Sequence, residues 1–232
     1  MGPIVVPSTL ESAPDEGTLR FWDAIGRCLL GTNASVEALS VYRKLLEAYV
    51  SIGVKPTDRV YANVLNRIAC CHVQQGDYEL AAQVQNVCCS RLATPGYRDR
   101  NHLAMLHFLG VSYRYCEDQE RAFEAFERCR QGRAELLGMD HPEYLETVSN
   151  VVACATVRQQ SHYGIQLLSE CCTSVKSKLG QRHPTYIRML CSLGNAHAGA
   201  HEFEKALVIL QKCLVLLASV AGTDSVQHIE IL

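Results

Sequence analysis

The 232-residue sequence has almost no net charge, since 22 lysines and arginines are set against 24 aspartates and glutamates. Without a positive excess, nothing in its composition would draw the chain to a nucleic acid backbone or to an anionic lipid surface. We therefore expect no nucleic-acid partner.

The sequence also lacks any run close to the roughly 20 apolar residues that a membrane-spanning helix needs. Its first residues, MGPIVVPSTLESAPDEG, do not have the basic and then apolar order of a signal peptide. The start does not continue as a myristoylation signal either, because Pro3 follows Gly2 and Val6 replaces the required hydroxyl. We expect a soluble, cytoplasmic protein with no membrane insertion and with a flexible tail over residues 1–17.

Motifs of the common enzyme classes are missing as well. The sequence contains no P-loop, no G-x-G-x-x-G after a strand, no G-x-S-x-G and no H-E-x-x-H. A Cys-His nucleophile stays open, because twelve cysteines and nine histidines will bring some pair together by chance. We expect a protein that is not an enzyme and that needs no cofactor.

What the sequence does have is a period of 42 residues. Cys129, Cys171 and Cys213 lie one period apart, and the segment GMDHP at 138–142 recurs as GQRHP at 180–184. A fixed period of this size indicates a repeat protein.

Each unit carries a two-helix pattern. The first unit reads FWDAIGRCLL and then ASVEALSVYRKLL, and the third reads LHFLGVSYRY and then RAFEAFERC. Apolar residues at steps of three and four make one buried stripe on each helix, and small residues such as Gly110 and Ala122 mark the closest approach of the two axes. No strand signal competes, so we predict an all-α fold.

This pattern resembles the tetratricopeptide repeat (TPR), which reads W-x2-L-G-x2-Y, then A-x3-F, then P. The segments LGMDHPEYLETVSNVV and LGQRHPTYIRMLCSLGN are similar to the kinesin light chain variety, in which L-G-x2-H-P opens a unit. The resemblance implies a right-handed α-solenoid of about five TPR-like helix-turn-helix repeats over residues 18–232.

The expected repeats lie near 18–52, 59–92, 100–137, 142–179 and 184–220, followed by a partial or capping helix at 225–232. The first helices are expected near 18–31, 59–75, 100–116, 142–159 and 184–200. The second helices are expected near 34–52, 77–92, 119–137, 161–179 and 203–220. In the two Gly-x-x-His-Pro segments, we expect the glycine to close one helix in a left-handed conformation and the histidine to cap or orient the next. The proline is then expected in the first turn of that next helix.

Four cysteines share one position on the second helices, seven residues after the small residue of the helix contact. They are Cys88, Cys129, Cys171 and Cys213. Because a free cysteine behaves as a small buried apolar residue, we interpret them as structural thiols that stand in for alanine.

The strongest candidate for a metal site is the set Cys171, Cys172, His197 and His201, because H-x3-H on a helix is a credible ligand pair. Adjacent cysteines, however, lack the two-to-four-residue separation of zinc sites. We expect no metal.

The resemblance implies a role in protein–protein interaction. Stacked helix pairs form a superhelix whose concave face is lined by first helices and holds extended peptides or partner helices. We expect a scaffold or adaptor that binds a protein or peptide ligand in this groove, similar in role to the cargo-binding domain of kinesin light chain, with association with the cytoskeleton as a further expectation. Two alternatives are a regulatory TPR domain of a larger enzyme or signalling protein, and a thiol or metal enzyme.

Residues that flank the packing stripe of each first helix are expected to face the groove. They are Asn66, Arg67, His107, Arg114, Tyr115, Ser149, Asn150, Arg188 and Asn195. Asn150 matches, by resemblance, one of the family's groove asparagines, and its amide can both donate to and accept from a peptide backbone. The three arginines favour an acidic peptide or a C-terminal carboxylate as the ligand.

Overall fold

The computed structural model describes residues 14–91 and 99–221, and within these ranges it contains ten α-helices and no strand. The first helices of the repeats are α1 (Glu16–Gly31), α3 (Arg59–Gln75), α5 (Arg100–Tyr115), α7 (Pro142–Val157) and α9 (Pro184–Gly199). The second helices are α2 (Ser35–Ser51), α4 (Tyr78–Arg91), α6 (Gln119–Leu137), α8 (Ser161–Leu179) and α10 (Phe203–Ala221). The predicted all-α fold of five helix-turn-helix repeats is confirmed over the described residues, and the expected helix at 225–232 lies outside them.

Every predicted end of the ten helices agrees with the observed end to within two residues. The start of α1 is one place where the local cause is visible: Asp15 Oδ1 accepts a hydrogen bond from the Thr18 N–H at 2.7 Å, so the helix begins at Glu16. The expected tail of residues 1–17 is therefore too long at its inner end, and residues 1–13 of it lie outside the described residues.

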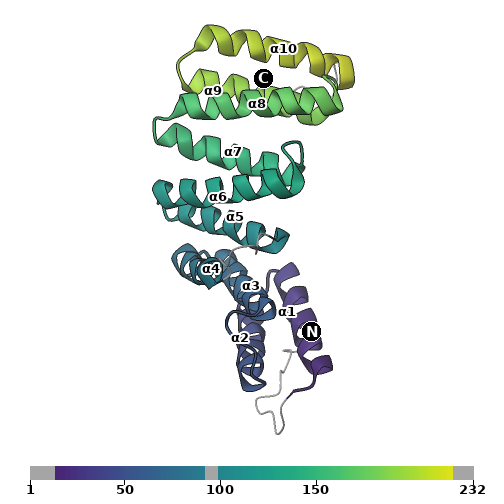
Figure 1. Cartoon of the computed structure of the whole chain (residues 1–232), viewed down its shortest axis with the longest axis vertical. Helices are drawn as coiled ribbons and strands as arrows, with labels where there is room; N and C mark the ends of the chain where they lie inside the picture. The colour runs from purple at the N-terminus through teal and green to yellow at the C-terminus, as the bar shows by residue number, and fades with distance from the viewer. Residues whose placement is uncertain (1–13, 92–98, 222–232) are drawn as a thin grey trace. The chain divides into compact units, whose positions relative to one another are not determined.

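The chain divides into two compact units, Met1–Asp118 and Gln119–Leu232, and each is described by itself. The division falls in the turn between α5 and α6, inside the third repeat. In unit 1 each helix from α1 to α5 packs on the next helix in the chain, and the same holds from α6 to α10 in unit 2 (Figure 1). This succession places first and second helices in alternation within each unit.

The periodic cysteines are buried, as predicted. Cys129, Cys171 and Cys213 are 0% exposed and Cys88 is 1% exposed. Their thiols contact first helices: Cys88 Sγ lies 4.0 Å from the carbonyl oxygen of Ala62 on α3, and Cys213 Sγ lies 3.9 Å from that of Ile187 on α9. The predicted burial of these four residues is confirmed, and their role as structural thiols stays an interpretation.

The two Gly-x-x-His-Pro segments begin helices in the predicted way. His141 Nδ1 accepts from the Glu143 N–H at 3.2 Å, and His183 Nδ1 accepts from the Thr185 N–H at 3.2 Å. A proline follows each histidine at the start of α7 and α9, where its missing N–H costs nothing. The glycine before α9 has the expected positive φ of 86° but a ψ of 166°, so Gly180 is extended rather than left-handed helical.

The turn between the two helices of every repeat contains one residue with φ > 0. These residues are Asn33, Gly76, Glu117, Gln159 and His201, with φ between 59° and 82°. Four of the five are not glycine, although L-residues other than glycine are disfavoured in this conformation. The sequence analysis did not find this feature, because residues of such different kinds form no pattern.

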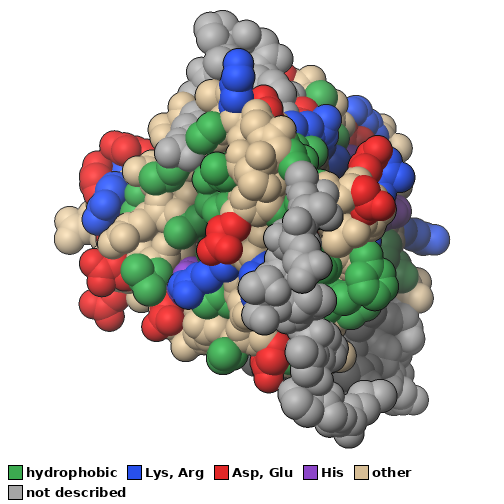
Figure 2. Space-filling view, turned by 90° about the horizontal axis from the view of Figure 1, so that it is seen from below, with side chains coloured by type: hydrophobic (Ala, Val, Ile, Leu, Met, Phe, Trp, Pro, Cys, Tyr) green, Lys and Arg blue, Asp and Glu red, His purple; other side chains and the backbone are tan. Residues whose placement is uncertain are grey.

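The surface carries charges of both signs. Figure 2 shows acidic and basic side chains interspersed on the visible face, which agrees with the near-zero net charge of −2. Among the helices that the structure describes, none combines the length and the apolar character needed to cross a bilayer.

Candidate functional site

A hollow on each unit is lined only by first helices. The hollow of unit 1, called here the α3 hollow, has a volume of about 280 Å³ and is lined by Leu30, Asn63, Asn66, Arg67, Cys70, Asn101, Ala104 and Met105. The hollow of unit 2, the α7 hollow, has a volume of about 470 Å³ and is lined by Pro142, Glu143, Leu145, Glu146, Ser149, Asn150, Arg188 and Met189. Five of the nine predicted groove residues line these two hollows.

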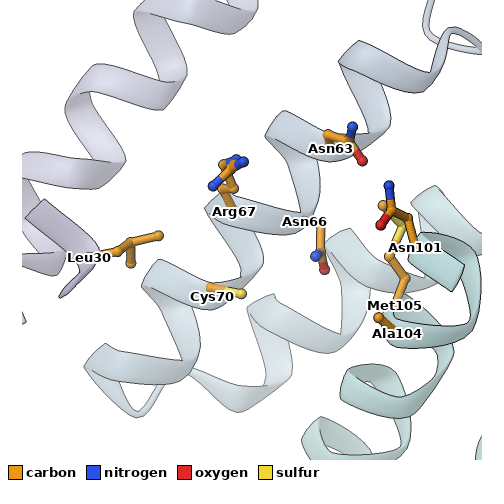
Figure 3. A pocket seen from close by; sticks show the side chains of 8 residues that line it. All are labelled: Leu30, Asn63, Asn66, Arg67, Cys70, Asn101, Ala104 and Met105. Carbon is orange, nitrogen blue, oxygen red and sulfur yellow. The ribbon is translucent and has the colours of Figure 1, made fainter. Parts of the chain in front are cut away.

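In the α3 hollow, the lining residues of α3 occur at steps of three and four, which places them on one face of the helix. Figure 3 shows that Asn63 and Asn66 lie on the side of α3 that faces Asn101 on α5. Arg67 lies on the other side, toward Leu30 of α1. The hollow therefore has a carboxamide side and an arginine side.

The positive charge of Arg67 is balanced within unit 1. Its Nε lies 3.1 Å from Asp23 Oδ1 on α1, and its guanidinium carbon lies 5.9 Å from the centre of the Tyr42 ring. Burial raises the pKa of Tyr42 to about 12, so this phenol is neutral near pH 7. The α3 hollow consequently presents little net charge to a ligand.

On the carboxamide side of the hollow, one side-chain atom finds no partner within residues 14–91 and 99–221. Asn66 Oδ1 is buried and has no hydrogen-bond partner among the described residues. A buried acceptor without a partner costs about 1–3 kcal/mol. Such an atom is where a ligand N–H group would gain most.

In the α7 hollow, the predicted groove residues of α7 form side-chain hydrogen bonds to carbonyl groups of their own helix. Ser149 Oγ donates to the Leu145 carbonyl at 3.1 Å, and Asn150 Nδ2 donates to the Glu146 carbonyl at 3.2 Å. Arg188 reaches this hollow from α9 and is exposed.

The other four predicted groove residues line neither hollow. Tyr115 is 55% exposed and stacks on Tyr78 of α4 at 4.2 Å between ring centres, and the Arg114 guanidinium carbon lies 6.0 Å from the centre of the Tyr115 ring. Asn195 is exposed, and its Nδ2 lies 3.9 Å from Cys191 Sγ on the same helix.

His107, which was predicted to face the groove, is only 6% exposed. It follows Leu103 by four residues and precedes Gly110 by three, and both of these are buried. This spacing puts His107 on the packed face of α5 rather than on an open surface.

Asn63 and Asn101 line the α3 hollow but were not among the predicted residues. Asn63 precedes Asn66 by three residues and Cys70 by seven, so helical spacing alone could have found it. Asn101 could not be found in this way, because it depends on how α5 packs beside α3.

Four thiols of the core are not activated. Burial raises the pKa of Cys71 and Cys172 to about 12, and that of Cys171 and Cys213 to about 11. These four thiols are therefore protonated near pH 7, whereas the thiolate is the nucleophile and the metal ligand.

The candidate metal ligands are not gathered into one site. His197 Nδ1 lies 2.6 Å from Glu202 Oε2, so this ring is directed at the start of α10. Across residues 14–91 and 99–221 the structure contains no group of three or more His, Cys, Asp or Glu residues arranged to hold a metal ion.

Comparison with known proteins agrees with this architecture. The sequence profile described as "Tetratricopeptide repeat" matches residues 102–143. The putative kinesin light chain TPR-like repeats of Podosopora anserina superpose with a TM-score of 0.80 at 16% identity, over 92% of this chain and 100% of that chain. BtubC (BKLC) from P. vanneervenii superposes with a TM-score of 0.72 at 14% identity, over 90% of this chain and 83% of that chain.

A third similar structure is YrrB, described as "a TPR protein with an unusual peptide-binding site", with a TM-score of 0.58 at 16% identity over 84% of each chain. No curated protein sequence matches the chain. The chain is thus an all-α repeat protein of the α-solenoid class. Residues 102–143 match the tetratricopeptide repeat profile, and the fold of the described residues is similar to that of kinesin light chain TPR-like repeats.

Proposed function

We propose that the chain is a scaffold or adaptor that binds a peptide, or an extended segment of a partner protein, along its first helices. The observation that carries this proposal is the pair of hollows, one on each unit, that only first helices line. Repeat proteins bind extended partners through such surfaces, on which each repeat contributes one strip of side chains.

An acidic side chain or a C-terminal carboxylate fits the α7 hollow best. Arg188 lines it and is exposed, whereas Arg67 in the α3 hollow already pairs with Asp23. Glu143 and Glu146 also line the α7 hollow. Glu143 pairs with Arg133 at 3.4 Å, and Glu146 disfavours a second acidic group in the ligand. We therefore propose a ligand with one acidic group at this site, and include association with the cytoskeleton as part of the proposal.

A library of displayed eight-residue peptides with free C-termini tests the proposal. Peptides enriched on the wild-type chain should bind the double variant Ser149→Ala, Arg188→Ala at least about tenfold more weakly, since an ion pair and a polar contact are lost. Arg128→Ala is the matched control, because Arg128 is an exposed arginine on the second helix α6. It should change binding less than about twofold, within the uncertainty expected of a remote surface charge.

The melting temperature of each variant establishes that folding is unchanged. If the library yields no enriched peptide, or if Arg128→Ala weakens binding as much as the double variant does, the first helices are not the binding surface.

A further inference from the structure

Three side-chain carboxamides line the α3 hollow, and the described residues do not use them as hydrogen-bonding partners. Asn66 Oδ1 is buried without a partner, and Asn63 and Asn101 make no side-chain hydrogen bond within the described part of the chain. Asn66 also lines the hollow, so a group that enters the hollow can approach its carboxamide.

The three carboxamides come from two helices and share one side of the hollow. Figure 3 shows Asn63 and Asn66 on α3 and Asn101 on α5 on facing sides of the same space. A carboxamide offers two N–H donors and an oxygen with two lone pairs. The group best matched to several of them must therefore donate more than once and accept as well.

The charges of the lining residues argue against an ammonium group or a carboxylate as the ligand group in the α3 hollow. The lining residues include no acid, and Arg67, the one charged residue among them, is paired with Asp23 at 3.1 Å. An ammonium group would meet no partner of opposite charge, and a carboxylate could not donate to Asn66 Oδ1. A neutral ligand group leaves no buried charge uncompensated.

We infer that the α3 hollow binds the side-chain carboxamide of an asparagine or glutamine in the peptide ligand. This inference rests on the proposed function and specifies the chemistry of the contact that unit 1 makes with the ligand. The volume of about 280 Å³ is large enough for the end of an asparagine or glutamine side chain.

A primary carboxamide fits better than the peptide backbone does. A backbone amide has one N–H, whereas the end of an asparagine or glutamine has two N–H groups and an oxygen, all within one small group. If the Asn66 carboxamide were turned over, its buried atom would be a donor instead of an acceptor, and the same ligand group would still satisfy it.

The α7 hollow does not share this property. There Asn150 Nδ2 already bonds to the Glu146 carbonyl at 3.2 Å, and Ser149 Oγ to the Leu145 carbonyl at 3.1 Å. Ser149, at the helix position of Asn66, and its neighbour Asn150 are thus bonded within their own helix in unit 2, whereas Asn66 Oδ1 has no partner among the described residues of unit 1. We therefore expect the α3 hollow of unit 1, and not the α7 hollow of unit 2, to prefer a ligand carboxamide.

The experiment is a positional scan. The eight-residue library is selected on the wild-type chain, and one enriched peptide is then synthesised with Gln, Glu or Met at its selected position. Affinities are measured for the wild type, for Asn66→Leu and for Asn101→Leu. Asn195→Leu is the matched control, because Asn195 is an exposed asparagine of the first helix α9 that lines neither hollow.

The wild type should prefer the Gln peptide over the Glu and Met peptides by about tenfold, the effect of losing one or two hydrogen bonds. Asn66→Leu and Asn101→Leu should reduce this preference to less than about twofold, and Asn195→Leu should leave it intact. If Asn66→Leu does not fold, Asn101→Leu decides the matter, because Asn101 is exposed and tolerates replacement.

Enriched peptides that show no preference for Asn or Gln at any position would overturn this inference and leave the proposed function standing. So would a preference that survives in Asn101→Leu. If the wild type enriches no peptide, both the inference and the proposed function fail.

Discussion

Gly26 of α1 packs directly against the ring of Tyr42 on α2. A Cβ atom added to Gly26 would lie 2.5 Å from Tyr42 Cζ and 2.6 Å from Cε1. Tyr42 is 0% exposed in the core of unit 1, so its ring has no free space into which to move. The repeat pattern has a small residue at this position because the aromatic ring on the facing helix leaves no room for a larger one.

We predict that Gly26→Ala destabilises the protein by about 1–2 kcal/mol. Overpacking of a core costs about 1–3 kcal/mol, and the gain in helix propensity offsets up to about 1 kcal/mol of it. The control is Gly31→Ala at the end of the same helix, where an added Cβ meets nothing within 4 Å. Urea denaturation measures both, and equal midpoints for the two variants would contradict the packing argument.

The 42-residue period predicts the ten helices and the buried cysteines, because both depend on spacing along the chain. It predicts the histidine caps for the same reason, since His141 and His183 each bond two residues ahead. Features that depend on contacts between helices were not predictable. The burial of His107, the place of Asn101 beside Asn66 and the internal bonding of Asn150 all require knowledge of which faces meet.

The turn residues with positive φ lead to a second prediction. Gln159 is exposed and has a φ of 59°, a conformation that costs a residue with a Cβ about 1–2 kcal/mol. Gln159→Gly should stabilise the protein by about 0.5–1 kcal/mol, because relief of strain exceeds the added entropy of the unfolded chain. Gly76→Ala, at the equivalent turn with a φ of 82°, should destabilise it. Thermal unfolding measures both, and a lower melting temperature for Gln159→Gly would show that its side chain stabilises the turn.

Alkaline pH should destabilise unit 2 through its buried thiols. Burial raises the pKa of Cys213 to about 11, and an unfolded cysteine has a pKa of about 8.5. Between these values the folded chain holds the proton and the unfolded chain releases it, so the unfolding free energy is unaffected below about pH 8.5 and falls as pH rises through this window.

Cys213→Ala should cost little at pH 7, because alanine fits the same space, and should make the decline between pH 8.5 and pH 10.5 shallower. Cys28→Ala, which removes an exposed thiol of α1, should leave the slope unchanged. The unfolding free energy from urea titrations across this range measures the effect, and identical slopes for the wild type and Cys213→Ala would disprove it.

The last prediction concerns Arg133, a charged residue of α6 that is only 4% exposed. Its Nη1 donates to the Glu143 carbonyl oxygen at 2.6 Å and to Thr147 Oγ1 at 2.7 Å, both on α7, and its Nη2 lies 3.4 Å from Glu143 Oε2. Arg133→Ala should destabilise the protein by about 2–4 kcal/mol, because it leaves a cavity and removes the donor from the buried Thr147 hydroxyl.

Arg133→Met separates packing from charge, since methionine fills much of the same volume and brings no charge into the interior. Replacement of a buried ion by an apolar side chain of similar size is often close to neutral, so this variant should cost no more than about 1–2 kcal/mol. The side chain of Glu143 is 25% exposed and can recover hydration when its partner is lost, which limits the cost further. Chemical denaturation of both variants decides the question. A methionine variant as unstable as the alanine variant would mean that the guanidinium hydrogen bonds, rather than the volume of the side chain, hold α6 against α7.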